Sequence, residues 1–163
     1  MSDIYKYSLE ELDQLEGDEI RLEKFDSTVC WKLGSIARDL SLERYPKKAV
    51  VIDISLSSGQ VLFHSVTNDG TALDNDQWIA RKKRTVLRFG KSSFYIGQKL
   101  RIKELPMEEA LFVSPIDYAS HGGSVPIRVK GVDGVIGTLT ISGLAQEEDH
   151  LLAIEVLTKV SKN

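Results

Sequence analysis

The chain has 163 residues, of which 42% are hydrophobic and 28% charged, and this composition fits one globular domain with a proper core. Its formal net charge of −3 argues against general affinity for nucleic acid or for an acidic membrane surface. The single cysteine excludes an internal disulfide and favours a cytoplasmic location, and the acidic N-terminus lacks the apolar core of a signal peptide.

Two helices are predicted in the first 45 residues. Ser8 and Glu11 form a capping-box pattern ahead of a short helix that ends near Glu16. A longer helix over 25–45 carries an apolar stripe at helical spacing, made of Val29, Leu33, Ile36 and Leu40. Cys30 flanks this stripe, so we expect a buried, unreactive thiol. We expect 1–24 to be a helical lead-in to a domain that spans 25–163.

A β-hairpin is predicted over 49–56 and 61–66, because two apolar, β-branched runs flank a Ser-Gly turn. A two-residue turn pairs Leu56 with Val61, Ile54 with Phe63, and Asp53 with His64. Asp53 and His64 then lie side by side on one face of the sheet. Such a pair is either a structural ion pair or a buried acid/base couple.

The densest run of unusual residues is the predicted helix after residue 73. Asp74 and Gln77 form a capping pattern, and the side that faces a core is formed by Ile79, Val86 and Phe89. Asn75, Asp76 and Trp78 precede a basic run, Arg81-Lys82-Lys83-Arg84. This run is either a solvated helix face or a cradle for an anion or for acidic residues across an interface. A second helix is predicted over 92–100.

Gly90-Lys91-Ser92 has the wrong context for a phosphate-binding loop. That motif requires a glycine at position 85, which is Thr85, and it opens a helix, whereas here it ends one. We therefore predict no nucleotide site of this kind. In the segment that follows, 107–110 is predicted to form a helical turn, and the apolar residues 112–116 are expected to cover the sheet.

The sequence Ser120-His121-Gly122-Gly123-Ser124 marks the best single site candidate. Paired glycines allow positive φ or a close backbone approach, and His121 beside them can bind a ligand or transfer a proton. A loop histidine that only forms hydrogen bonds is the alternative. A second hairpin over 125–130 and 135–141 and a last helix over 145–162 complete the chain.

The histidines offer only weak metal candidates. Glu147 and His150 have helical spacing, but a second half of a metal motif is missing, and His64 is isolated in sequence from the other two histidines. We expect no metal site, and motifs of the common hydrolases, zinc proteases and dinucleotide enzymes are absent from the sequence.

Three long runs carry a family resemblance. LDNDQWIARKKRTVLRFGKSSFYIG, YASHGGSVPI and TISGLAQEEDH occur in this order, together with a glycine-rich strand–turn–strand–helix pattern over 122–153. The chain resembles the haem-degrading domain family (GlcG/HbpS-like), in the longer branch found in bacteria and fungi. The resemblance implies a profilin-like α+β domain, an antiparallel sheet with helices packed on it, and a homo-oligomer. It makes haem a possible ligand, with His121, His64 or His150 as the axial residue.

Three functions follow from these observations. The first is a non-enzymatic binder of haem or another small anionic ligand, with its site formed by His121, Gly122, Gly123, Asp74, Asn75, Asp76, Trp78, Arg81 and Lys82. The second is an oligomeric interaction protein, in which the same polar residues hold subunits together. An enzyme that uses His121 with Asp149 or Glu148 ranks lowest, so we assign no catalytic residue.

Overall fold

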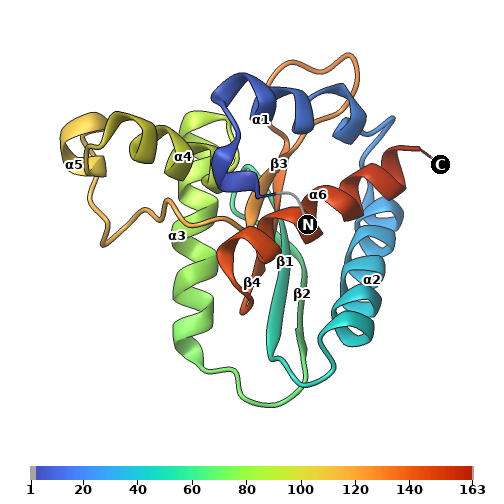
Figure 1. The fold of residues 1–163 in the computed structure, drawn as a ribbon. Helices are drawn as coiled ribbons and strands as arrows, with labels where there is room; N and C mark the ends of the chain where they lie inside the picture. The colour runs from blue at the N-terminus through green and yellow to red at the C-terminus, as the bar shows by residue number, and fades with distance from the viewer. Residues whose placement is uncertain (1–2, 163) are drawn as a thin grey trace.

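The computed structural model describes residues 3–162, which form a single α+β domain (Figure 1). The fold class predicted from the sequence is therefore confirmed. The described elements are, in chain order, η1 Ile4–Lys6, α1 Leu9–Leu15, η2 Asp18–Ile20, α2 Ser27–Arg44, β1 Val50–Leu56, β2 Val61–Thr67, α3 Leu73–Phe89, α4 Ser93–Lys103, α5 Met107–Ala110, β3 Ser124–Ile127, β4 Gly137–Ser142 and α6 Gln146–Ser161.

The four strands form one antiparallel sheet in the order β2-β1-β4-β3. The predicted pairs Asp53–His64 and Ile54–Phe63 are confirmed. The predicted pair of Leu56 with Val61 is wrong, because an irregularity after Ile54 places Ser55 opposite Val61. A bulge of this kind inserts one residue into one strand and shifts every later pair.

One face of the sheet is apolar and carries the main core. The core side chains of β1, β3 and β4 alternate along the strands, as the period of a β-strand requires, and are Val50, Ile52, Ile54, Val125, Ile127, Leu139 and Ile141. Helices α2 and α6 cover this face. Cys30, Leu33 and Ala37 of α2 belong to the same core, which confirms the predicted buried thiol.

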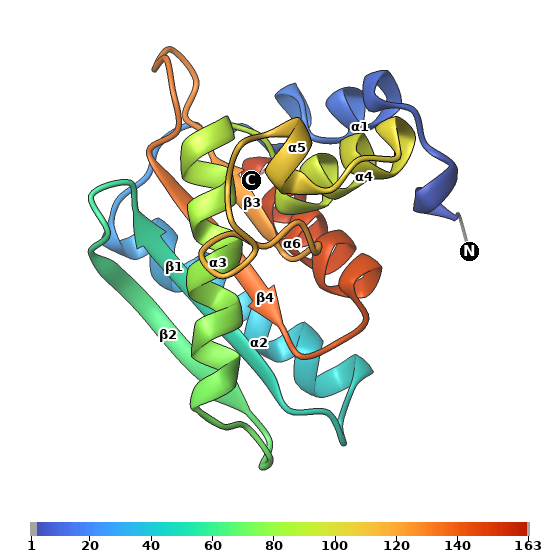
Figure 2. The same ribbon diagram turned by 90° about the vertical axis from the view of Figure 1, so that its left-hand side faces the viewer.

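The opposite face is polar, and α3 lies across it (Figure 2). Its side chains include Asp53, Ser55, Ser124, Thr138, Thr140 and Ser142, which are all buried. An apolar helix face would leave these groups without partners, and a buried polar group without a partner is costly. Helix α3 instead turns Lys82 and Lys83 toward the sheet, so the basic run is not a solvated face along its whole length.

The N-terminal lead-in packs against the domain at two places. Ile4 and Leu12 form a small cluster with Phe94 of α4. Leu22 forms a parallel bridge with Val129, with its N–H donating to the Arg128 carbonyl at 2.9 Å. The predicted capping box of α1 is confirmed, since Glu11 N–H donates to the Ser8 hydroxyl at 3.1 Å. The division into a lead-in and a domain stays a prediction.

The start of α3 and the segment after α5 differ from expectation. The helix begins at Leu73, and its cap is a hydrogen bond from Ala72 N–H to Asn75 Oδ1 at 2.8 Å, so Asp74 is not the cap residue. Phe112 and Ile116 do not cover the sheet, because they are 84% and 81% exposed. They belong to an arm, formed by α4, α5 and the following loop, that projects sideways in Figure 1.

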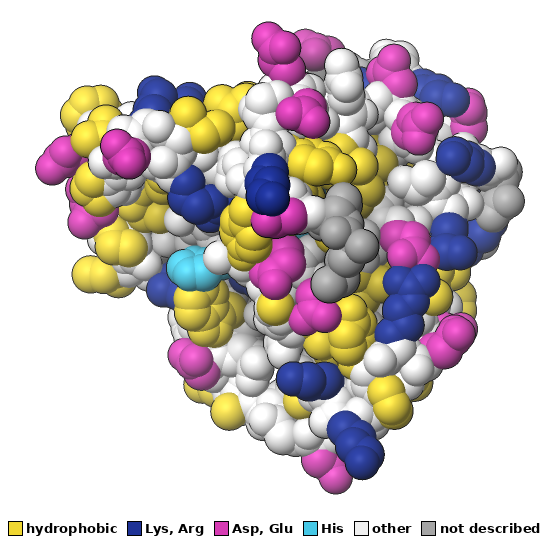
Figure 3. Space-filling model, viewed as in Figure 1, with side chains coloured by type: hydrophobic (Ala, Val, Ile, Leu, Met, Phe, Trp, Pro, Cys, Tyr) yellow, Lys and Arg dark blue, Asp and Glu magenta, His cyan; other side chains and the backbone are white. Residues whose placement is uncertain are grey.

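The surface seen in Figure 3 mixes acidic and basic side chains, and hydrophobic side chains gather over the arm of α4 and α5. Among the helices of residues 3–162, none combines the length and the apolar character that crossing a bilayer requires.

Candidate functional site

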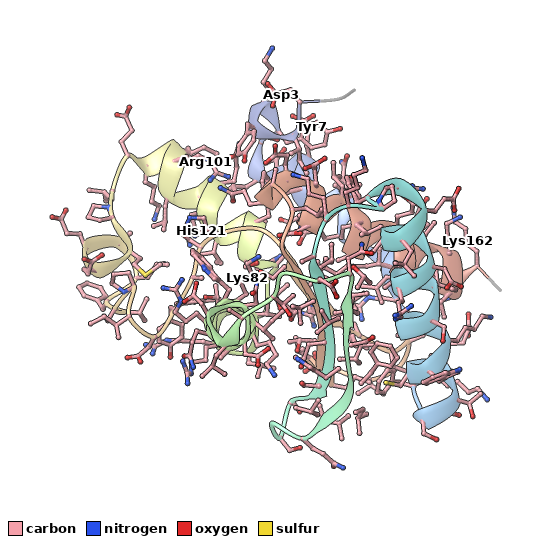
Figure 4. The ribbon with its side chains drawn as sticks, turned by 90° about the horizontal axis from the view of Figure 1, so that it is seen from below. Asp3, Tyr7, Lys82, Arg101, His121 and Lys162 are labelled. Carbon is pink, nitrogen blue, oxygen red and sulfur yellow. The ribbon has the colours of Figure 1, made fainter. Side chains whose placement is uncertain are left out.

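A cleft of about 400 Å³ opens between the first half of α3, the loop before β3 and the turn that leads into α6. A volume of this size suits a small ligand. The residues that line it are Asp74, Asn75, Trp78, Lys82, His121, Ser142, Gly143, Leu144, Gln146 and Asp149. Figure 4 shows His121 and Lys82 on the same side of α3.

Lys82 and Asp149 form a buried ion pair at the base of the cleft. Their side chains are 3% and 2% exposed, and Nζ lies 3.3 Å from Oδ2. Asp149 Oδ1 also accepts a hydrogen bond from Leu144 N–H at 3.1 Å, so the carboxyl group closes the first turn of α6. Burial lowers the pKa of Lys82 and raises the pKa of Asp149 to about 7, although each partner opposes the shift of the other.

His121 lies at the rim of the cleft, against an aromatic and cationic stack. Its ring meets the Trp78 ring edge-on, with centroids 4.9 Å apart, and the Arg81 guanidinium lies 4.1 Å from the Trp78 centroid. Desolvation is the main cause that lowers the pKa of His121, and the positive charges of Lys82, Arg81 and Arg101 lower it further. The imidazole is therefore neutral at pH 7 and surrounded by cations.

The two glycines after His121 are required by close backbone contacts, as the sequence predicted. Gly123 has φ of 138°, and a Cβ there would overlap the Ile141 carbonyl and lie 2.7 Å from Lys82 Nζ. Gly122 N–H donates to Gln146 Oε1 at 3.0 Å, and a Cβ at this position would lie 2.9 Å from the Phe94 ring. The loop is thus wedged between α3 and α6.

We expect Gly123→Ala to destabilise the fold by about 3 kcal/mol or more. The positive φ of Gly123 already disfavours a side chain, and the added Cβ would also clash with the backbone and displace Lys82 Nζ. Gly131→Ala is the matched control. Gly131 also has a positive φ, 79°, but a Cβ there meets nothing within 4 Å, so about 1 kcal/mol is expected. Urea unfolding measures both values. Equal losses for the two variants would contradict the close contact at Gly123.

The cleft brings together five of the residues proposed from the sequence, namely Asp74, Asn75, Trp78, Lys82 and His121. Gly122 and Gly123 hold the loop without lining the cleft. Arg81 packs over Trp78 and donates to the Pro115 carbonyl at 3.2 Å. Asp76 instead lies 3.2 Å from His64 Nε2. Whether these residues bind a ligand stays a prediction.

Sequence reasoning missed Ser142 and Gln146 as lining residues, and it named Asp149 only as a neighbour of His121 in an enzyme. Asp149 lies 67 positions after its partner Lys82, so local spacing carries no signal of the pair. The three acids in the first turn of α6 were interpreted as dipole chemistry. One of them, Asp149, is 1% exposed, and burial of a carboxyl group is a signal that only the fold reveals.

His64 and His150 are held in structural contacts. His64 Nδ1 lies 3.0 Å from Asp53 Oδ2, and its Nε2 faces Asp76, so both ring nitrogens are engaged by carboxylates. His150 is fully buried and stacks on Phe94, with centroids 5.0 Å apart. Within residues 3–162 no three ligand side chains are grouped in a way that holds a metal ion.

Comparison with known proteins gives the family. The sequence model of the family described as "Haem degrading protein HbpS-like" matches residues 25–158. The UPF0303 protein YBR137W of Saccharomyces cerevisiae is 49% identical over 152 residues, covering 93% of this chain and 83% of the relative. The UPF0303 protein SCO2848 of Streptomyces coelicolor is 45% identical, and the match covers 90% of each chain.

Comparison with solved structures also finds matches. The crystal structure of the Ybr137w protein matches with a TM-score of 0.93 at 46% identity, over 98% of this chain and 92% of the other. A structure described as a PduOC:heme complex shares the fold, with a TM-score of 0.65 at 17% identity over 83% of this chain and 94% of the other. The extent and order of these matches show that the chain belongs to the HbpS-like haem-degrading protein family, among the relatives called UPF0303 proteins.

Proposed function

We propose that this chain is a non-enzymatic binding protein whose cleft takes a small anionic ligand beside the loop His121-Gly122-Gly123. The observation that carries this proposal is the positive charge around the His121 ring. Lys82, Arg81 and Arg101 each lower the pKa of His121, so an anion placed next to the ring is attracted by the same charges.

The lining favours a ligand that is small and polar. Asn75, Ser142 and Gln146 bring amide and hydroxyl groups to the cleft, and Trp78 supplies one flat apolar wall. Asp149 offsets the charge of Lys82 at 3.3 Å, so Arg81, which packs over Trp78, supplies the remaining attraction, and the neutral His121 ring supplies a hydrogen bond. A carboxylate of a few carbon atoms, with its acid group toward His121, matches this arrangement.

Haem fits the cleft of a single chain poorly. A macrocycle requires apolar walls on both of its faces, but Trp78 and Leu144 are the only large apolar residues among those that line the cleft. His121 is the best placed of the three histidines to reach an iron atom, since His150 is fully buried and both ring nitrogens of the exposed His64 face carboxylates. The haem complex of the PduOC structure supports a ligand-binding role for this fold.

Calorimetric titration with citrate, and separately with haemin, tests the proposal. We expect saturable citrate binding that His121→Ala and Arg81→Ala each weaken about tenfold, which corresponds to about 1.4 kcal/mol. Arg84→Ala is the matched control, because Arg84 is exposed on the same helix and donates to the Asp117 carbonyl. Equal affinity for all three variants, or tight haemin binding that His121→Ala leaves unchanged, would refute the proposed ligand class.

An interaction protein is the second candidate, and the exposed apolar residues of the arm favour it. Ile102, Phe112 and Ile116 are 56%, 84% and 81% exposed, and exposed apolar groups that gather on one surface often mark an interface. The family resemblance predicts a homo-oligomer. Under this function the double variant Phe112→Ser/Ile116→Ser lowers the mass measured by light scattering, whereas Val132→Ser, at an exposed site outside the arm, leaves it unchanged.

A further inference from the structure

A second pocket, distinct from the cleft, lies where the N-terminal lead-in meets the domain. It encloses about 270 Å³ and is lined by Asp13, Glu16, Gly17, Arg21, Gly90, Lys91, Pro126 and Arg128. Its basic side chains come from three separate segments: Arg21 follows η2, Lys91 follows α3, and Arg128 follows β3.

Backbone contacts bring two of these basic side chains together. Leu22 N–H donates to the Arg128 carbonyl, and Lys130 N–H donates to the Leu22 carbonyl, each at 2.9 Å. Leu22 and Val129 are the two partners of this parallel bridge, and Arg21 and Arg128 are the residues immediately before them. The Arg128 guanidinium is fixed from one side, because Nη2 donates to the Gly90 carbonyl at 2.8 Å.

Arg21 and Arg128 bring like charges to the same pocket. Burial lowers the pKa of Arg128, the charge of Arg21 lowers it further, and Asp133 opposes the shift. Lys91 adds a third cation, whose Nζ lies 2.6 Å from Asp13. If Glu16 is left out of the count, the side chains that line the pocket carry three positive charges and one negative charge, that of Asp13.

Glu16 is the unusual member of the pocket. Its side chain is 7% exposed, and Oε2 is buried without a hydrogen-bond partner within the described residues, 3.5 Å from His150 Nε2. Desolvation raises the pKa of Glu16 to about 7, with Asp13 adding to the shift and Ser92 and Lys91 opposing it. Below that pH the protonated carboxyl group is neutral and leaves the positive charge of the pocket intact.

We infer that this pocket binds the phosphate group of a small phosphorylated molecule, with Arg21 and Arg128 as its principal ligands. Two guanidinium groups can each give paired hydrogen bonds to a phosphate, and the bound anion removes their mutual repulsion. The volume admits a phosphate group with a small substituent. Because the site joins the lead-in to the domain, its occupation stabilises their contact.

The test is a calorimetric titration with pyrophosphate at pH 6, at constant ionic strength set with chloride. We expect saturable binding that Arg128→Gln and Arg21→Gln each weaken tenfold or more. Arg88→Gln is the matched control, because Arg88 is an exposed arginine that packs on Phe89 and Tyr118 outside the pocket. Arg21→Gln decides the result if Arg128→Gln fails to fold, because the substitution removes a partly exposed ion pair, that of Arg21 Nε with Asp18 Oδ1 at 3.5 Å.

A second measurement compares the affinity for pyrophosphate at two pH values. The groups that face Glu16 are Asp13 on α1, Lys91 and Ser92 before α4, and His150 on α6. Wild-type affinity for pyrophosphate is expected to fall from pH 6 to pH 8 as Glu16 ionises, and Glu16→Gln is expected to bind more tightly than wild type at pH 8. Absence of saturable binding, or equal affinity of Arg21→Gln and wild type, overturns the inference. Unchanged pyrophosphate binding in His121→Ala separates this site from the cleft.

Discussion

Lys82→Met is expected to destabilise the protein by about 3–5 kcal/mol at pH 8, because it leaves the Asp149 carboxylate buried without its cation. The loss is expected to shrink at pH 5, where Asp149, whose pKa burial already raises to about 7, takes up a proton. Urea unfolding at the two pH values measures the difference.

A double-mutant cycle identifies the pair as the cause. Lys82→Met/Asp149→Leu replaces both charges by apolar groups, so its loss is expected to be smaller than the sum of the two single losses. Part of the Asp149→Leu loss remains in the double variant, since Leu144 N–H also loses its acceptor. Arg84→Met, on the exposed side of the same helix, is the control and is expected to change stability by less than about 0.5 kcal/mol. Additive single losses would contradict a coupled pair.

The second large effect concerns the buried pair Glu16 and His150. The free energy of unfolding is expected to depend on pH with opposite sign in the Glu16→Gln and His150→Gln variants. Glu16 Oε2 and His150 Nε2 lie 3.5 Å apart. Burial raises the pKa of Glu16 from 4.5 to about 7 and lowers the pKa of His150 from 6.5 to about 3. Between pH 4.5 and 6.5 the folded pair therefore holds one proton, on Glu16, and the unfolded pair also holds one, on His150.

Because both states bind one proton, the pair contributes little to the pH dependence of wild-type stability in this window. Glu16→Gln removes the group that binds the proton in the folded state. His150 then binds a proton only in the unfolded state, and stability is lost as the pH falls below 6.5. His150→Gln leaves Glu16, which binds a proton only in the folded state, and stability is lost as the pH rises from 4.5 to 7.

Each loss, taken relative to wild type, is expected to reach about 3 kcal/mol across its window, at about 1.4 kcal/mol per pKa unit. Urea unfolding at intervals between pH 4.5 and 7.5 measures both slopes. Subtraction of the wild-type profile removes shared contributions, such as that of Asp149. Two variants with parallel slopes would show that Glu16 and His150 do not exchange a proton on unfolding.

Local sequence signals predicted the elements of the fold well. The Ser8 capping box and the apolar stripe of α2 placed their helices within two residues of the observed bounds. Two apolar, β-branched runs around a Ser-Gly turn placed both strands of the first hairpin, and the two-residue turn gave its central register. The register failed only past Ile54, where the edge strand β2 contains one extra residue, Leu62, while β1 keeps a regular register with β4.

The candidate site was predicted less completely, because its chemistry depends on long-range pairs. Trp78 and His121 stood out as unusual residues, and the fold does bring their rings together. The burial of Lys82 had no local signal, since the polar sheet face beneath α3 is assembled from three strands. Phe112 and Ile116 were expected to cover the sheet because they are apolar, and their exposure depends on the direction of the arm.

The binding role of the cleft is tested most directly by the fluorescence of Trp78. The chain has two tryptophans. Trp31 lies on α2 and is 68% exposed, so Trp31→Phe leaves Trp78 as the single reporter inside the cleft. We predict a saturable change in its emission on titration with citrate, lost when His121→Ala is added and absent from the matched Trp78→Phe protein. A flat titration of the Trp31→Phe protein, or an equal response from the Trp78→Phe protein, would contradict ligand binding at this cleft.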